Sequence, residues 1–230
     1  MKKLLFLVIT AWLVSLSAEA QRYPYGRTHH ARKSRTSYAY RHQHDRAGDT
    51  YGGVRFGLGL STVNSDSPYL DGNKTRTGFV GGVVVGTRLS DVTPLYLEGG
   101  IYFTQKGGKS ENKGEKFTYQ LDYVEMPLTF KYKVDLGYDV ALEPFAGGFF
   151  ACGVNGKIKD YQNRAAYSSF SDEYRDNFNR LDGGIRVGCG LSIDQMYLEA
   201  AYDFGLANVG KDNFDDTHTG AFNLTLGVNF

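Results

Sequence analysis

The sequence predicts an all-β protein, an eight-stranded antiparallel up-and-down barrel that spans a membrane. From about residue 51 to the C-terminus, the chain repeats segments in which every second position is apolar, and a period of two is typical of β-strands. Long and short connections alternate strictly between these segments. The 230 residues include 29 Gly, 17 Tyr and 15 Phe but only 5 Pro. Because soluble domains average about 7% Gly, this composition argues against an ordinary helical or α/β enzyme.

The same composition excludes a protein with several membrane-spanning helices. The mean hydropathy is −0.38, and beyond the extreme N-terminus no stretch approaches the roughly 20 apolar residues that a spanning helix needs. A spanning β-strand needs only about 9–11 residues, and half of them can be polar. A membrane barrel is therefore compatible with this chain.

The N-terminus predicts secretion. Met1-Lys2-Lys3 is a short basic segment, residues 4–18 carry no charge, and Ala18-Glu19-Ala20 has the small-x-small pattern of a cleavage site. These are the three parts of a signal peptide, so we expect residues 1–20 to be removed after Ala20. The alternative, a membrane anchor, is too short to span a bilayer.

Residues 21–50 form a separate basic segment. They carry a net charge of +5 and four of the five His, whereas residues 51–230 carry −5. We expect this segment to be disordered, because it cannot bury enough apolar surface to offset its ordering entropy. It is a solvated linker, a contact for an anionic periplasmic partner, or a weak metal-binding segment. The His pairs at 29–30 and 42–44 lack the further ligands of a closed metal site.

Eight segments carry the strand pattern. They cover residues 54–61, 79–89, 95–104, 124–132, 139–154, 184–193, 196–206 and 222–230. The first alternates apolar side chains with Arg, Gly and Ser, and Val80 and Val84 blur the second. The third and fourth alternate cleanly, and the fifth is less regular. The sixth places Gly and Arg186 opposite its apolar residues, and the last two alternate up to the terminal Phe230.

The connections predict how the barrel is oriented. Long ones lie at about 63–76, 107–116, 155–179 and 207–218, and short ones at about 90–93, 134–138 and 194–195. An even number of strands favours a closed barrel, because closure leaves no exposed edge. Bacterial outer-membrane barrels have short periplasmic turns and longer external loops. The pattern therefore predicts an outer-membrane location with both termini in the periplasm.

A secreted lipocalin-like ligand carrier is the rival eight-stranded barrel, with its apolar face turned inward around a ligand. Two features favour the outer-membrane barrel. Glycines are frequent on the polar face, where they would weaken a soluble strand but would make room for charged neighbours in a narrow barrel. The chain also ends on Phe230 after a strictly alternating strand. A terminal aromatic of this kind is typical of the signal that the outer-membrane assembly machinery reads.

Three motifs carry a resemblance to a known family. They are Leu97-Glu98 to Gln105-Lys106-Gly107, Tyr123-Val124-Glu125-Met126-Pro127-Leu128 to Lys131-Tyr132, and Tyr202-Asp203-Phe204-Gly205-Leu206 with Asn208. With these motifs, residues 51–230 resemble the PorT-like outer-membrane β-barrel proteins of the Bacteroidetes. The resemblance implies a small outer-membrane barrel. One eponymous member is implicated in secretion of surface proteins, and most members have no assigned activity. The basic segment is not part of that pattern.

The polar face is expected to line a charged interior. The alternation turns these side chains inward: Arg55, Arg88, Glu98, Glu125, Lys131, Glu143, Arg186, Glu199 and Asp203. Buried charges are tolerated only when they are paired and hydrogen-bonded, and here five acids face four bases. An eight-stranded interior is barely wide enough for its own side chains. We therefore predict an ion-pair network that plugs the barrel, and a conducting pore is the alternative.

The longest loop and the two cysteines are further candidates. The loop 155–179 carries four aromatic residues among charges: Tyr161, Tyr167, Phe170 and Tyr174. Loops on a rigid scaffold often carry binding function, so these residues either recognise a protein or glycan or pack as a cap over the barrel mouth. Cys152 and Cys189 either form a disulfide, which the compartment permits, or remain two small lipid-facing residues.

A lipid-modifying enzyme is the remaining alternative, since some small outer-membrane barrels are enzymes of that kind. Such chemistry needs a nucleophile, a base and an orienting acid. His218 is the sole His beyond the basic segment, beside Asp212, Asp215 and Asp216. This loop lacks the ordered spacing of a calcium site and is equally consistent with a solvated acidic turn. We therefore predict a non-enzymatic barrel surrounded by outer-membrane lipid, with no cofactor, metal or nucleic-acid partner.

Overall fold

The computed structural model describes residues 48–65, 74–112, 115–159, 165–171, 176–212, 214 and 216–230. The predicted signal peptide and most of the basic segment lie outside these residues. The last residues of that segment belong to the barrel instead. Gly48 N donates to Arg88 O and Arg88 N donates to Asp49 O, both at 2.9 Å. The barrel therefore begins slightly before residue 51.

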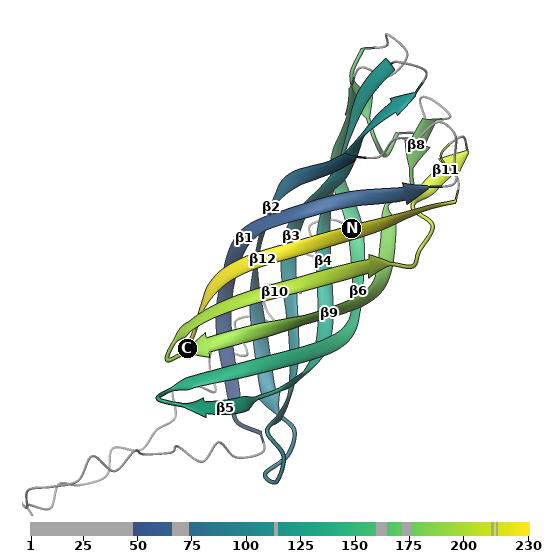
Figure 1. Cartoon of the computed structure of the whole chain (residues 1–230). Helices are drawn as coiled ribbons and strands as arrows, with labels where there is room; N and C mark the ends of the chain where they lie inside the picture. Colours follow the sequence, from purple (N-terminus) through teal and green to yellow (C-terminus); the bar gives the residue numbers. More distant parts are fainter. Residues whose placement is uncertain are drawn as a thin grey trace, which may run out of the picture. The chain divides into compact units, whose positions relative to one another are not determined.

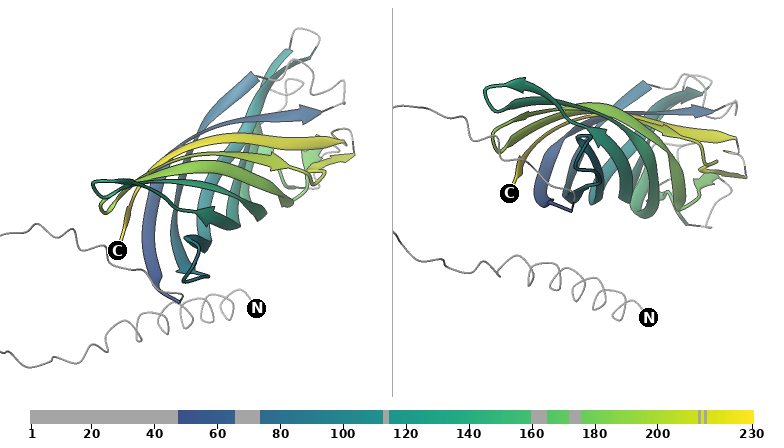
Figure 2. Two further views of the ribbon diagram at one scale, coloured as in Figure 1. Left: turned by 60° about the horizontal axis from the view of Figure 1, so that its bottom comes forward. Right: turned by 90° about the horizontal axis from the view of Figure 1, so that it is seen from below.

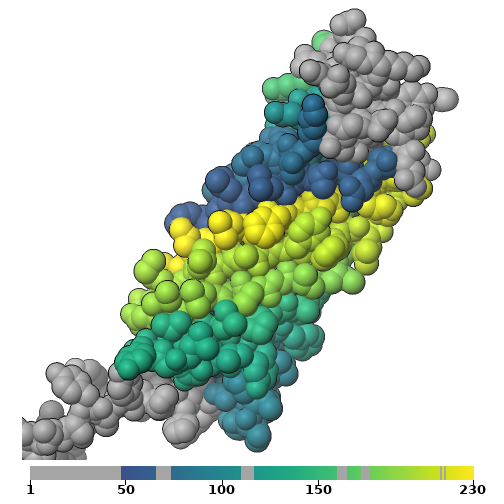
Figure 3. All heavy atoms as spheres, in the orientation of Figure 1, coloured from purple at the N-terminus to yellow at the C-terminus, as the bar shows by residue number. Residues whose placement is uncertain are grey.

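Eight long strands form a closed antiparallel barrel (Figure 1, Figure 2). They are β1 (Thr50–Ser65), β2 (Lys74–Arg88), β3 (Leu95–Asn112), β4 (Glu115–Tyr132), β6 (Val140–Lys159), β9 (Leu181–Ile193), β10 (Met196–Gly205) and β12 (Thr217–Asn229). Each pairs with the next, and the ring closes because β4 pairs with β6 and β12 pairs with β1. Figure 3 shows blue β1 directly beside yellow β12 on the surface. The predicted eight-stranded barrel is confirmed.

Short strands lie at both ends of the barrel. They are β5 (Val134–Gly137), β7 (Tyr167–Ser168), β8 (Asp176–Phe178) and β11 (Gly210–Asp212). β5 forms a hairpin with β6, and its turn residues Tyr138 and Asp139 have φ of 56° and 59°, as a two-residue type I′ turn requires. We call the end with this hairpin and the C-terminus the turn end. The opposite end, where β8 pairs with β11, is the cap end (Figure 1).

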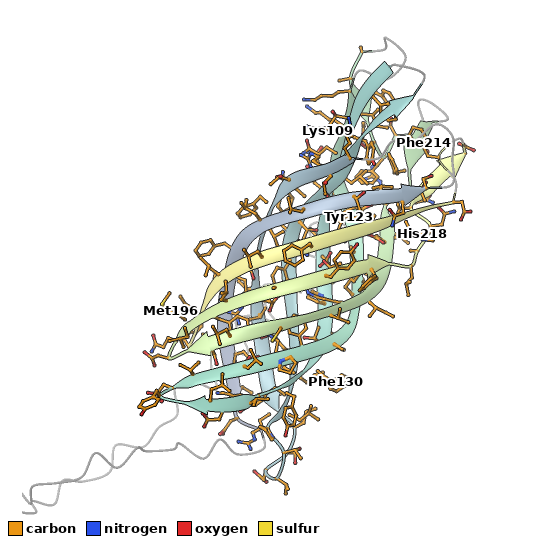
Figure 4. All side chains as sticks on the ribbon, viewed as in Figure 1. Lys109, Tyr123, Phe130, Met196, Phe214 and His218 are labelled. Atoms are coloured by element: carbon orange, nitrogen blue, oxygen red, sulfur yellow. The ribbon has the colours of Figure 1, made fainter. Side chains whose placement is uncertain are left out.

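Apolar side chains form a belt on the outside of the barrel. On β4, Met126, Leu128 and Phe130 expose 44%, 54% and 53% of their surface, whereas Glu125, just before them, exposes 0% and Thr129, between Leu128 and Phe130, exposes 3%. The labelled Phe130 and Met196 lie on the outer surface in Figure 4. The apolar face therefore points outward and the charged face inward, as predicted. This arrangement contradicts the lipocalin-like alternative, which requires the opposite sense.

The strands extend further toward the cap end than the sequence pattern indicates. The expected loop at 107–116 is mostly strand, because β3 and β4 remain paired up to Asn112 and Glu115. The pattern is hidden there since the outward positions, Lys109, Thr118 and Gln120, are polar or charged rather than apolar. The expected loops at 155–179 and 207–218 likewise contain β7, β8 and β11. Within the described residues, no helix has the length and apolarity to cross a membrane.

Candidate functional site

The barrel interior holds a continuous network of ion pairs. Across the described chain, nine buried charged residues take part: Arg55, Lys106, Lys131, Arg186, Glu98, Glu125, Asp182, Glu199 and Asp203. Arg186 on β9 is the centre of the network. Its Nη1 lies 2.7 Å from Glu125 Oε1 and 3.4 Å from Asp203 Oδ1, and its Nη2 lies 3.4 Å from Glu199 Oε1.

Two lysines extend the network toward the two ends of the barrel. Lys131 Nζ lies 2.8 Å from Glu98 Oε1 and 3.5 Å from a Glu199 oxygen. Lys106 Nζ lies 2.9 Å from Glu125 Oε2 and 3.5 Å from Asp182 Oδ2. Glu98 and Lys106 are eight residues apart on β3. At about 3.4 Å per residue, the network therefore extends for about 27 Å along the strand.

Aromatic rings and amides complete the packing around the charges. The Arg55 guanidinium lies 4.0 Å from the centroid of the Tyr197 ring, and Lys131 Nζ lies 4.5 Å from the same centroid. Asn223 Nδ2 donates to Asp203 Oδ2 at 2.6 Å. Such contacts offset the desolvation of buried charges. The interior is thus occupied by paired side chains over the length of the network.

The structure brings together most, but not all, of the predicted interior charges. Glu143 is buried but joins no ion pair among the described residues, and Arg88 lies at the turn end, where its Nε donates to Ser90 O at 2.8 Å. The prediction missed Lys106 and Asp182. Both lie just beyond the alternating segments at 95–104 and 184–193, and β3 and β9 continue past those segments. Continuing the alternation by one residue pair on each strand would have found them.

The cap end holds a second, apolar core above the charged interior. This cap core consists of Val63, Phe117, Tyr119, Leu121, Tyr123, Phe149, Ala151, Ile158, Tyr167, Phe170, Phe178, Val209 and Phe214. Phe214 is fully buried, and its ring centroid lies 5.2 Å from that of Phe178 and 6.5 Å from that of Phe117. Figure 4 places Phe214 at the end of the barrel beside β8 and β11.

Hydrogen bonds hold the cap segments together. Asn208 Oδ1 accepts from the backbone N–H groups of Gly210 and Thr217 at 3.0 and 3.1 Å. Asn179 Nδ2 donates to Gly210 O at 2.9 Å. Ser169 Oγ donates to Gln120 O on β4 at 2.8 Å. The segments that join β6 to β9 and β10 to β12 are therefore fastened to each other and to the barrel wall.

The cap core corrects part of the binding hypothesis for the loop 155–179. Tyr167 and Phe170 expose only 7% and 8% of their surface and belong to the cap core. Phe170 packs edge-on against Tyr123, with ring centroids 5.9 Å apart. These two residues therefore close the barrel mouth rather than offer a surface to a ligand. Tyr161 and Tyr174 lie outside the described residues.

The disulfide hypothesis is contradicted by the strand register. Cys189 pairs with Pro144 and Cys152 pairs with Leu181, so the two cysteines lie eight residues apart along neighbouring strands. That offset corresponds to about 27 Å, whereas a disulfide needs Cα atoms within about 7 Å. Both thiols are free and half-buried. The sequence alone does not show this offset, because it depends on the register in which β6 pairs with β9.

We expect the purified barrel to contain two free thiols. Alkylation after unfolding, without a reducing agent, should add two labels per chain, and Cys152→Ser should add one. The measurement is intact mass under non-reducing conditions. An unlabelled chain that takes up two labels only after reduction would contradict the observed register.

The surroundings of His218 do not form a catalytic set. Its Nδ1 lies 3.0 Å from Ala207 O, and its Nε2 lies 3.9 Å from a carboxylate oxygen of the exposed Asp216. The alternative of a lipid-modifying enzyme needs a base in contact with a nucleophilic hydroxyl or thiol, and His218 makes no hydrogen bond to either within the described chain. The same residues contain no group of three or more His, Cys, Asp or Glu side chains that could hold a metal ion.

A closed barrel with an apolar outer belt and a charged, filled interior defines a membrane-spanning β-barrel. The family model described as outer membrane protein beta-barrel domain matches residues 43–210, and the chain belongs to this family. The protein is therefore located in the outer membrane, with lipid around its belt. A search of curated proteins found no match.

Several solved outer-membrane proteins have a similar fold. Neisserial surface protein A is 14% identical, with a TM-score of 0.47, and the match covers 79% of this chain and 97% of that one. OprG of Pseudomonas aeruginosa is 12% identical, with a TM-score of 0.47 and coverage of 82% and 98%. Ail of Yersinia pestis, crystallised with the heparin analogue sucrose octasulfate, is 14% identical, with a TM-score of 0.42 and coverage of 79% and 99%.

The lipid belt predicts a depth-dependent response to charge. Leu128 lies in the middle of the belt on β4, and Tyr132 lies on the same face at the turn end. We expect Leu128→Arg to lower the free energy of unfolding in lipid vesicles by about 2–4 kcal/mol, and Tyr132→Arg by about 0–1 kcal/mol. Urea titrations of both variants test this. Equal losses of unfolding free energy for the two variants would contradict the placement of Leu128 at the middle of the belt.

Proposed function

We propose that this protein is a non-enzymatic, non-conducting barrel that presents its cap end outside the cell for interaction with a partner. The short turns and both termini then face the periplasm, and the capped end carries the longer connections, as in other bacterial outer-membrane barrels. In this arrangement the barrel is a rigid anchor, and the cap is the part available to another molecule.

The observation that carries the proposal is the ion-pair network in the interior. An eight-stranded barrel is just wide enough for side chains to fill it, and here each of the nine charges in the network has a partner of opposite sign along about 27 Å of strand. Moving any one of them aside would remove an ion pair from each of its buried partners, which is unfavourable. An interior filled by such an ion-pair network supports a role in anchoring and recognition rather than in transport through the barrel.

The finer role that we propose is accessory to the secretion or display of surface proteins. It rests on the resemblance to PorT-like barrels of the Bacteroidetes, carried by the motifs around Glu98, Glu125 and Asp203. All three residues belong to the interior network. A protein or glycan ligand would bind the outer surface of the cap, since Tyr167 and Phe170 are buried in the cap core. The basic segment 21–47, preceded by a cleaved signal peptide, would meet an anionic periplasmic partner.

The terminal residue fits a role in assembly. Phe230 is 77% exposed, and its backbone N–H and C=O both bond to Gly52 at 2.9 Å, which joins the end of β12 to β1. The ring therefore contributes little to packing and is free for the assembly machinery to recognise. We expect Phe230→Ala to lower the amount of folded barrel in the membrane without lowering the stability of the barrel refolded in vitro.

A deletion strain tests the proposed role. The strain is complemented with the wild-type chain or with a chain lacking residues 160–175, and the proteins at the cell surface and the lipid A profile are compared. Loss of surface proteins in both the deletion strain and the loop-deleted strain, with unchanged lipid A, supports the proposal. A changed acylation pattern of lipid A would instead identify a lipid-modifying enzyme.

A further inference from the structure

The outer face of the cap end carries four lysines in two adjacent rows. Cross-strand pairing places Lys74, Lys109, Thr118 and Lys159 in one row over β2, β3, β4 and β6. The next row toward the belt holds Gln120, Lys157 and Ser168. Directly paired residues lie on the same side of a sheet with their Cβ atoms about 4.5–5.5 Å apart. We call this surface the lysine face.

The lysine face points away from the molecule. All four lysines are exposed. Ile158, between Lys157 and Lys159 on β6, and Tyr119, between Thr118 and Gln120 on β4, are fully buried in the cap core. Figure 4 shows Lys109 at the cap end. Lys109, Lys157 and Lys159 make no ion pair and no side-chain hydrogen bond with any residue in the described ranges. Their charges are therefore available to a molecule outside the barrel.

Among the described side chains on the outer face of β2, β3, β4 and β6 at the cap end, no exposed carboxylate balances Lys109, Lys157 and Lys159. Lys74 and Lys109 are directly paired, and like charges opposite each other destabilise a sheet. Asp122 lies on the same side of β4, but it is 2% exposed, and its oxygens already accept hydrogen bonds from Gln120 and Asn155 at 2.9 and 3.2 Å. A clustered positive charge of this kind favours an anionic partner.

The position of the lysine face relative to the apolar belt indicates which anionic partner it contacts. On β6 the exposed apolar residues end at Val154, and Lys157 follows three residues later, about 10 Å along a tilted strand. Lysine side chains reach back toward an interface through their long stems. The polar headgroups of a bilayer lie directly beyond its hydrocarbon core, so they adjoin Lys157. We propose that the lysine face binds the phosphate groups of anionic lipid headgroups in the leaflet at the cap end.

Lipid A retention by the purified barrel tests this proposal without depending on how the barrel is oriented in the cell. The detergent-solubilised chain is mixed with phosphorylated lipid A or with the same lipid after removal of its phosphates, and bound lipid is measured by native mass spectrometry. The test variant is Lys109→Gln/Lys157→Gln/Lys159→Gln. The control is Lys133→Gln, at the turn end. Folding is checked by the faster migration of the folded barrel on an unheated gel.

A lysine near an anionic surface contributes roughly fivefold in affinity, so we expect the triple variant to bind phosphorylated lipid A at least about tenfold more weakly. The control should bind as the wild type does, and dephosphorylated lipid A should bind both proteins equally weakly. Unchanged retention by the folded triple variant would overturn the proposal. Soluble tripolyphosphate that binds the wild type as tightly as lipid A would also overturn it, because the ligand would then be a free phosphate rather than a headgroup.

Discussion

Replacement of Arg186 by Met is expected to lower the free energy of unfolding of the barrel by about 3–5 kcal/mol. Arg186 faces Glu125, Glu199 and Asp203 within 3.4 Å, and all four side chains are at most 3% exposed. Methionine fills a similar volume but leaves these carboxylates without their shared cation, and an uncompensated buried charge has a cost of this size. Urea unfolding in lipid vesicles, followed by gel migration, measures the loss.

Two further variants separate this effect from a general loss of packing. Arg88→Met removes the same charge at the turn end, where Arg88 is only half-buried, and should cost less than about 1 kcal/mol. Adding Asp203→Asn to Arg186→Met removes one of the carboxylates that lost their cation. The double variant should therefore regain part of the free energy of unfolding. Equally small losses of unfolding free energy for Arg186→Met and Arg88→Met would contradict the stabilising role of the network. A further loss when Asp203→Asn is added to Arg186→Met would contradict it as well.

Replacement of Phe214 by Ala is expected to open the cap while the barrel stays folded. Truncating a buried Phe costs about 3–5 kcal/mol, and Phe214 is fully buried against Phe117 and Phe178. The cap is a small unit with a core of its own, so a loss of this size should unfold it locally rather than the whole barrel. Protease added to intact cells should then cleave near Arg180 and Lys211.

Phe204→Ala is the matched control for the cap. Phe204 lies on the outward face of β10 and is 48% exposed, so its loss removes an aromatic ring from the belt and leaves the cap core intact. We expect this variant to resist the protease as the wild type does. Cleavage of both variants at equal rates would show that the cap is not an independent unit, and cleavage only in broken cells would reverse the proposed orientation.

The sequence predicts the barrel well because the membrane imposes a strict pattern on each strand. On β1 the outward Phe56 and Leu58 alternate with the buried Arg55, and this alternation fixes both the period and the face of every strand. The pattern weakens above the belt, where water and lipid headgroups no longer require apolar residues. Lys109 therefore falls in the predicted loop at 107–116, although β3 and β4 are still paired there.

The site is predictable only in part, since its members depend on register and not on periodicity alone. The alternation correctly predicted that Arg186 and Glu125 face the interior. It does not show which inward residues contact each other across the barrel. Cys152 and Cys189 illustrate the same limit, because their true offset appears only in the pairing of β6 with β9. The burial of Phe214 depends on the pairing of β8 with β11, which carries no periodic signal.

Closure of the barrel interior by side chains is best tested by the electrical conductance of the purified protein in a planar lipid bilayer. We expect the wild-type barrel to add no resolvable current steps at neutral pH, even after insertion has been verified by protease protection. Regular steps that scale with salt concentration would contradict it, because ions could then cross an interior that the ion-pair network is argued to fill.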